Sequence, residues 1–130
     1  MQEPRELVFV YGTLRRGGSN HFRMDGADFI LPGTVRGRMY RFDWYPGLVV
    51  DATAGEIMGE VYAVGADQLA ALDEFEGISA TEIEGSEYRR VRVQVNSSNG
   101  PLIAWIWEWL GAVDENQRLS HGDWLNCPDI

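Results

Sequence analysis

The sequence is poor in cysteine and histidine, has no lysine, and contains no long apolar run. Cys127 is the single cysteine, so an intramolecular disulfide is impossible, which favours a reducing compartment. The two histidines, His21 and His121, lie far apart without the spacing of metal ligands, and no serine lies in a nucleophile-elbow pattern. No apolar stretch approaches the length of a membrane-spanning helix. We therefore predict a soluble, cytoplasmic protein whose chemistry uses no metal.

The charge balance is acidic, with 20 Asp and Glu residues against 11 basic residues and a formal net charge of -9. This excess argues against nucleic acid and anionic membrane surfaces as partners. The first six residues are polar and acidic, unlike a secretory leader, which agrees with a cytoplasmic location. The 130 residues suffice for a hydrophobic core, and no repeat or linker divides them. We expect a single domain over residues 1–130.

The most informative stretch runs from Leu7 to Gly18. Its apolar, β-branched and aromatic first part ends at Tyr11 and gives way to a polar, glycine-rich loop. This pattern is typical of a buried strand that delivers its last residues to a site. Gly12 permits a sharp turn and the close approach of a ligand, and the amides that follow can bind an anionic or carbonyl oxygen. An ordinary strand-to-loop turn is the alternative. A nucleotide-binding loop fits poorly, because Gly18 stands where that motif needs a lysine.

Short apolar segments between glycine- and proline-containing turns predict several strands. The expected strands cover residues 7–11, 29–36, 38–42, 57–64, 90–95 and 104–109, with an interruption at Pro32-Gly33 and a turn over residues 43–47. In the last strand Trp105, Trp107 and Trp109 share one face. This stripe favours core or interface packing over a ligand-stacking platform.

One helix is expected among these strands, from Ala66 to Phe75 or Glu76, so the predicted fold is α+β with a curled sheet or small barrel. Helical spacing places Glu76 on the apolar face, whereas Glu74 lies almost opposite. Burial and the negative end of the helix dipole both disfavour a charge there, and both are expected to raise the pKa of Glu76 toward neutrality. Such a carboxyl is a candidate acid–base group. Fraying of the helix at Glu76 is the alternative, and Asp73 is the next candidate.

Several motifs follow one another along nearly the whole chain: Val8 to Gly17 with Asn20-His21, Tyr45 to Val49, Gly59 to Tyr62, Leu72 to Gly77, Tyr88 to Val93 and Gly122 to Trp124. Their order resembles the γ-glutamylcyclotransferase-like family, in its small bacterial and γ-glutamylamine cyclotransferase-type branch. No single motif decides the match, but the ordered set is specific.

The resemblance implies a small mixed barrel or curled sheet with one main helix, and one cavity shared by the loop and the end of the helix. It assigns Tyr11, Gly12, Thr13 and Leu14 to the binding of a γ-glutamyl group and Glu76 to acid–base catalysis. The implied reaction is intramolecular aminolysis of a small γ-glutamyl amine or peptide, which forms 5-oxoproline and releases an amine. The substrate carries its own nucleophile, so no cofactor is expected.

A non-catalytic binding module for a small amino-acid-like ligand is the alternative on the same fold. The resemblance also singles out Tyr88, whose hydroxyl is expected to position the substrate or the glutamate, unless the ring only packs on the core. His21 is expected to cap a turn rather than line the cavity. Residues 78–87 are longer and more acidic than the connection usual in the family, which bears on the leaving group. The leaving group and the oligomeric state stay open.

Overall fold

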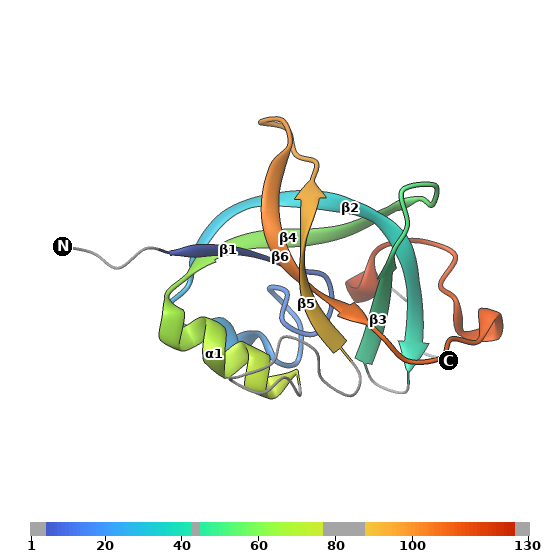
Figure 1. Ribbon diagram of the computed structural model, residues 1–130, viewed down its shortest axis with the longest axis horizontal. Helices are drawn as coiled ribbons and strands as arrows, with labels where there is room; N and C mark the ends of the chain where they lie inside the picture. The colour runs from blue at the N-terminus through green and yellow to red at the C-terminus, as the bar shows by residue number, and fades with distance from the viewer. Residues whose placement is uncertain (1–4, 43–44, 77–87, 127–130) are drawn as a thin grey trace.

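A computed structural model describes residues 5–42, 45–76 and 88–126 (Figure 1). In these ranges six strands form one mixed sheet in the order β3-β2-β4-β1-β6-β5, in which β1 and β6 pair in parallel and the other neighbours pair antiparallel. The elements are β1 (Glu6–Val10), η1 (His21–Met24), β2 (Asp28–Phe42), β3 (Tyr45–Val50), β4 (Glu56–Val64), α1 (Ala66–Phe75), β5 (Tyr88–Val95), β6 (Leu102–Trp109), η2 (Glu115–Gln117) and η3 (Trp124–Asn126). Within the described ranges, no helix is long and apolar enough to cross a membrane.

The sheet curls into a half-barrel, and α1 lies beside the loop that follows β1 (Figure 1). Both faces of β1 are buried, because Val8 and Val10 pack toward α1 and Phe9 packs inside the curl. A strand that is covered on both faces reads as a continuous apolar run, which explains the first part of the motif. The expected α+β class with one main helix is confirmed, and α1 has the expected bounds.

Two local expectations were wrong. The strand β2 continues through Pro32 without a break, because that half of β2 pairs with β4. On its other side the described residues form a single bridge, between Thr34 and Asn96, so a missing N–H at Pro32 is tolerated. The expected turn at residues 43–47 is also wrong in part, since Tyr45–Val50 forms β3 on β2. Pro46 fits this strand because its backbone faces away from β2. Asp43 and Trp44, like Cys127 and the acidic segment 78–87, lie outside the described residues.

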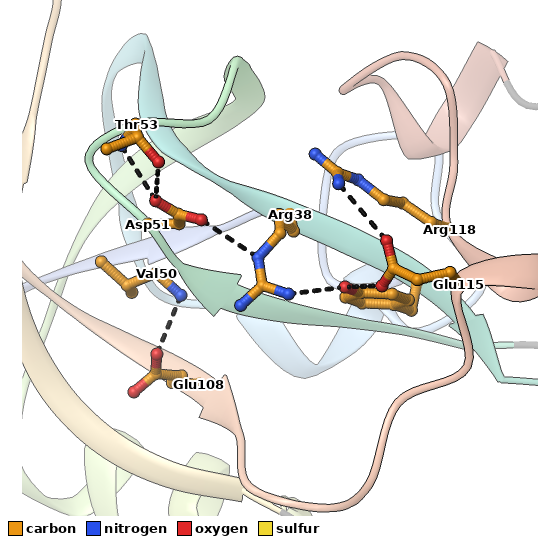
Figure 2. A network of polar contacts seen from close by, with 8 residues as sticks. Arg38, Val50, Asp51, Thr53, Glu108, Glu115 and Arg118 are labelled. Carbon is orange, nitrogen blue, oxygen red and sulfur yellow. Dashed lines mark hydrogen bonds and ion pairs between the residues drawn. The ribbon is translucent and has the colours of Figure 1, made fainter.

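A buried carboxylate ties the free edge of β3 to the far side of the curl. Glu108 of β6 accepts a hydrogen bond from the Val50 amide of β3 at 2.8 Å (Figure 2). Its other oxygen accepts two hydrogen bonds from Arg89 of β5, at 2.9 and 3.1 Å. The buried charge is thus compensated by a cation and a backbone donor. These bonds draw β3 toward β5 and β6 and close the curl on one side.

An outer polar network links β2 and β3 to the segment after β6 (Figure 2). Arg38 pairs with Asp51 at 3.2 Å and donates to the Tyr40 hydroxyl at 2.8 Å, which in turn donates to Glu115 at 2.7 Å. The bond from Tyr40 lowers the pKa of Glu115. Hydrogen bonds from Thr53 lower the pKa of Asp51.

These two lowered pKa values predict a loss of stability in acid. A carboxyl whose folded pKa lies below its unfolded value stabilises the fold above the unfolded pKa, and this contribution disappears as the pH falls through the folded value. We expect the free energy of unfolding to decline below about pH 4, and the Glu115→Gln variant to show a shallower decline. Urea unfolding between pH 7 and 3 measures this. Parallel curves for the two proteins would contradict the assignment.

Candidate active site

The loop after β1 is held in place by hydrogen bonds that its carbonyl groups accept. The Asn20 amide donates to the Thr13 carbonyl at 2.9 Å, and its side-chain amide donates to the Thr13 hydroxyl at 3.1 Å. His21 Nδ1 lies 2.9 Å from the Leu14 carbonyl, which gives this histidine the expected role in a turn. The backbone N–H groups of Gly12, Thr13 and Leu14 donate to no other group in the described part of the chain. Three consecutive free amides can bind an anion or a developing oxyanion.

Gly12 lies against β3 so closely that only glycine fits. A Cβ atom at this position would lie 2.5 Å from Cγ and 3.0 Å from Cδ of Pro46. The Pro46 carbonyl accepts a hydrogen bond from the Tyr88 hydroxyl at 2.7 Å, so this part of β3 is also tied to β5. The loop, β3 and β5 therefore meet at one place.

A largely buried ion network lies directly after the free amides. Arg15 pairs with Glu60 of β4 at 3.2 Å and with Asp123 near the C-terminus at 2.7 Å. Glu60 also accepts hydrogen bonds from the Arg16 amide at 2.8 Å and from the Tyr62 hydroxyl at 2.9 Å. Burial and the bond to Glu60 raise the pKa of Tyr62 to about 12. Sequence reasoning did not find this anchor of the loop, although Glu60 and Asp123 lie in segments that match the family.

The side chain of Tyr11 is fully engaged inside the curl. Its hydroxyl donates to the Trp107 carbonyl of β6 at 2.8 Å and accepts a hydrogen bond from the Leu48 amide of β3 at 3.3 Å. Burial raises the pKa of this phenol well above its ordinary value, and the charge of Glu76 raises it further. The hydroxyl thus links β3 to β6. The predicted role of Tyr11 in binding substrate stays a prediction, and it would use the backbone rather than the hydroxyl.

Tyr88 also uses its hydroxyl within the fold. Besides donating to the Pro46 carbonyl, its ring meets the Trp109 ring edge to face, with centroids 5.4 Å apart. The side chain is buried and packs in the same cluster as Leu14 and Leu72. A direct contact between Tyr88 and a substrate stays a prediction.

Glu76 is the residue at which α1 ends. Its backbone N–H still donates to the Leu72 carbonyl at 3.0 Å, so the last turn of the helix determines its position. The residue is half-buried, and its charge acts on the Tyr11 hydroxyl beside the loop. The structure therefore places Glu76 and the start of the loop within electrostatic range of each other. Acid–base catalysis by Glu76 stays a prediction.

Asp73, the second candidate carboxylate, has a different environment. It is buried, accepts a hydrogen bond from Trp107 Nε1 at 2.9 Å, and pairs with Arg90 Nε at 3.0 Å. A carboxylate that is held by one hydrogen bond and one ion pair in this way is suited to structure rather than to proton transfer. Exposed Glu74 faces solvent, as helical spacing predicts. Among the described residues, no three His, Cys, Asp or Glu side chains gather into a possible metal site.

Comparison with known proteins identifies the family. The model described as gamma-glutamyl cyclotransferase, AIG2-like, matches residues 8–126. The gamma-L-glutamyl-butirosin B gamma-glutamyl cyclotransferase of Niallia circulans is 31% identical over 119 residues, which cover 90% of this chain and 74% of that protein. The gamma-glutamylaminecyclotransferase of Rattus norvegicus is 34% identical over 120 residues, which cover 81% of this chain and 67% of that protein.

A solved structure agrees. The crystal structure of YkqA from Bacillus subtilis superposes with a TM-score of 0.75 at 28% identity, covering 93% of this chain and 40% of that longer chain. The chain therefore belongs to the AIG2-like gamma-glutamyl cyclotransferase family, and it is an enzyme of the cyclising type. The predicted family is confirmed.

Proposed function

We propose that the enzyme cyclises a small γ-glutamyl amide of an amine to 5-oxoproline. The α-amine nitrogen of the glutamyl group attacks its own γ-carbonyl carbon, the bond from that carbon to the amide nitrogen breaks, and the amine leaves. The α-ammonium nitrogen loses two protons as it becomes the lactam N–H, and the departing nitrogen gains two and leaves as an ammonium ion, so the reaction is balanced without an added reactant. Support for an amine as leaving group comes from the two relatives, whose names specify a γ-glutamylamine and a γ-glutamyl-butirosin.

The observation that supports this proposal is the electrostatic effect of Glu76 on Tyr11, the residue that directly precedes the three free amides. We assign to Glu76 the transfer of protons from the α-ammonium group to the leaving nitrogen. We assign to the amides of Gly12, Thr13 and Leu14 the binding of substrate oxygens. Much of the rate acceleration would come from holding the flexible glutamyl chain in a geometry close to attack. Because the substrate supplies the nucleophile, this mechanism needs no cofactor and no nucleophilic side chain.

A substrate panel tests the proposal. We expect the purified protein to release 5-oxoproline from γ-glutamyl amides of alkylamines, polyamines or the lysine side chain, as measured by chromatography of the acid product. The same amines linked through the α-carboxyl of glutamate are the matched controls, and they should release no amine and no 5-oxoproline, because displacement of the amine by the α-nitrogen would require a three-membered ring. Saturable binding of γ-glutamyl amines with no turnover on the whole panel would instead support the binding module.

A further inference from the structure

The two halves of the proposed site come from different parts of the fold. Glu76 ends α1, whereas the free amides follow β1. Turnover depends on the distance between them, because a misplacement of about 1 Å in an active site can cost two orders of magnitude in rate. Building on the proposed function, we infer that Trp107 of β6 is a positioning residue that fixes Glu76 relative to the loop at Gly12.

Trp107 is bonded to both halves at once. Its indole Nε1 donates to Asp73 of α1 at 2.9 Å, and its carbonyl accepts a hydrogen bond from the Tyr11 hydroxyl at 2.8 Å. All three residues are buried. Hydrogen bonds in such surroundings are costly to leave unmade, so each partner is held firmly to β6.

Because Asp73 and Glu76 belong to the same helix end, the bond between Asp73 and Trp107 also fixes the position of Glu76. Asp73 precedes Glu76 by three residues, which corresponds to about 4.5 Å along the helix axis and nearly one turn. Arg90 of β5 strengthens the anchor by pairing with Asp73 at 3.0 Å, and its guanidinium stacks on the Trp105 ring at 4.3 Å. Tyr11 precedes Gly12 directly, so the bond to its hydroxyl holds the start of the loop.

The other two tryptophans of β6 do not make this connection. Trp105 Nε1 donates to Glu6 at 3.2 Å, and Trp109 Nε1 donates to the Ala112 carbonyl at 3.2 Å. The tryptophan stripe in the sequence therefore has one member, Trp107, that is bonded to both the helix and the loop, and Trp105 serves as its control.

The first test compares Trp107→Phe with Trp105→Phe. The phenyl ring fills most of the space of the indole, and the substitution removes the donor to Asp73 while the backbone carbonyl that binds Tyr11 remains. We expect kcat of Trp107→Phe to fall about tenfold with KM within about twofold of wild type, because positioning of the proton-transfer group affects the transition state more than binding. Trp105→Phe removes the bond to Glu6 but keeps an aromatic face beside Arg90, so both constants should stay within about twofold. An unchanged kcat in folded Trp107→Phe would overturn the inference.

A double-mutant cycle tests whether the bond from Trp107 to Asp73 and the bond from Tyr11 to Trp107 act together in positioning Glu76. Tyr11→Phe removes the other bond to Trp107, and the losses of Tyr11→Phe and Trp107→Phe should be less than additive in the double variant. Fully additive losses would overturn the inference. If Trp107→Phe fails to fold, Tyr11→Phe alone still tests the inference. This variant should lower kcat about tenfold although Trp107 is intact.

A measurement without turnover separates this inference from the proposed function. Amide chemical shifts of Gly12, Thr13, Leu14 and Glu76 in ¹H–¹⁵N spectra should move in Trp107→Phe and stay near their wild-type values in Trp105→Phe. Wild-type protein that cyclises no member of the panel would defeat the proposed function alone. Unmoved amide signals in Trp107→Phe would defeat the positioning role, whatever the activity.

Discussion

Replacement of Glu76 by Gln should lower kcat by roughly a hundredfold or more while binding of the substrate survives. The amide keeps the size and hydrogen-bonding capacity of the carboxyl but cannot take up and return a proton. The backbone of Glu76 is held by Leu72, and the free amides at Gly12 to Leu14 lie on a separate segment, so the substitution leaves the binding groups in place. Rates of 5-oxoproline release and calorimetric binding of a γ-glutamyl amine measure the two effects.

Glu74→Gln is the matched control for this variant. Glu74 belongs to the same helix and is exposed, so its substitution removes the same charge without touching the site. We expect its kcat within about twofold of wild type. The stability of Glu76→Gln should stay level or rise, because a neutral amide replaces a half-buried charge at the negative end of α1. Equal rates of 5-oxoproline release in Glu76→Gln and wild type would show that another group transfers the proton.

The parts of the fold that local patterns determine could be predicted from the sequence. The buried strand β1 and the helix α1 follow from apolar periodicity, and their observed bounds differ from the expected ones by at most one residue. The extended state of Tyr45 to Gly47 could not be predicted, because proline and glycine in that segment indicate a turn. It arises from pairing with Tyr40 to Phe42, and only the tertiary arrangement shows that Pro46 needs no backbone donor there.

The candidate site likewise contains residues that could be predicted from the sequence and residues that could not. Glu76 and the glycine-rich loop could be found because each has a local signature, a carboxylate on an apolar helix face and a strand that ends in a polar loop. The anchors of these groups could not be found. Arg15 lies 45 residues from Glu60 and 108 residues from Asp123, and no local pattern records contacts over such separations. The same holds for Trp107, whose bonds to Asp73 and Tyr11 distinguish it from two otherwise similar tryptophans.

The contact between Gly12 and Pro46 leads to a second large expected effect. A methyl group at position 12 would overlap the Pro46 ring, with 2.5 Å to Cγ, so the loop must move away from β3 in Gly12→Ala. The shift would displace the amides of Gly12, Thr13 and Leu14, and we expect turnover to fall by about two orders of magnitude. Forcing an extra methyl into a packed position should also cost about 1–3 kcal/mol of unfolding free energy. Steady-state kinetics and urea unfolding measure the two losses.

Two further variants show whether overlap with the ring is the cause. Gly55→Ala adds the same methyl where no atom lies within 4 Å, and it should leave both rate and stability nearly unchanged. Pro46→Ala removes Cγ and Cδ and leaves Cβ, which lies 4.0 Å from the added methyl, so the double variant Gly12→Ala/Pro46→Ala should recover at least tenfold of the lost turnover. The Pro46 carbonyl that binds Tyr88 belongs to the backbone and persists in this variant. Without such recovery, the requirement for glycine would have to arise from the backbone of the loop or from a substrate that passes close to it, rather than from its packing on β3.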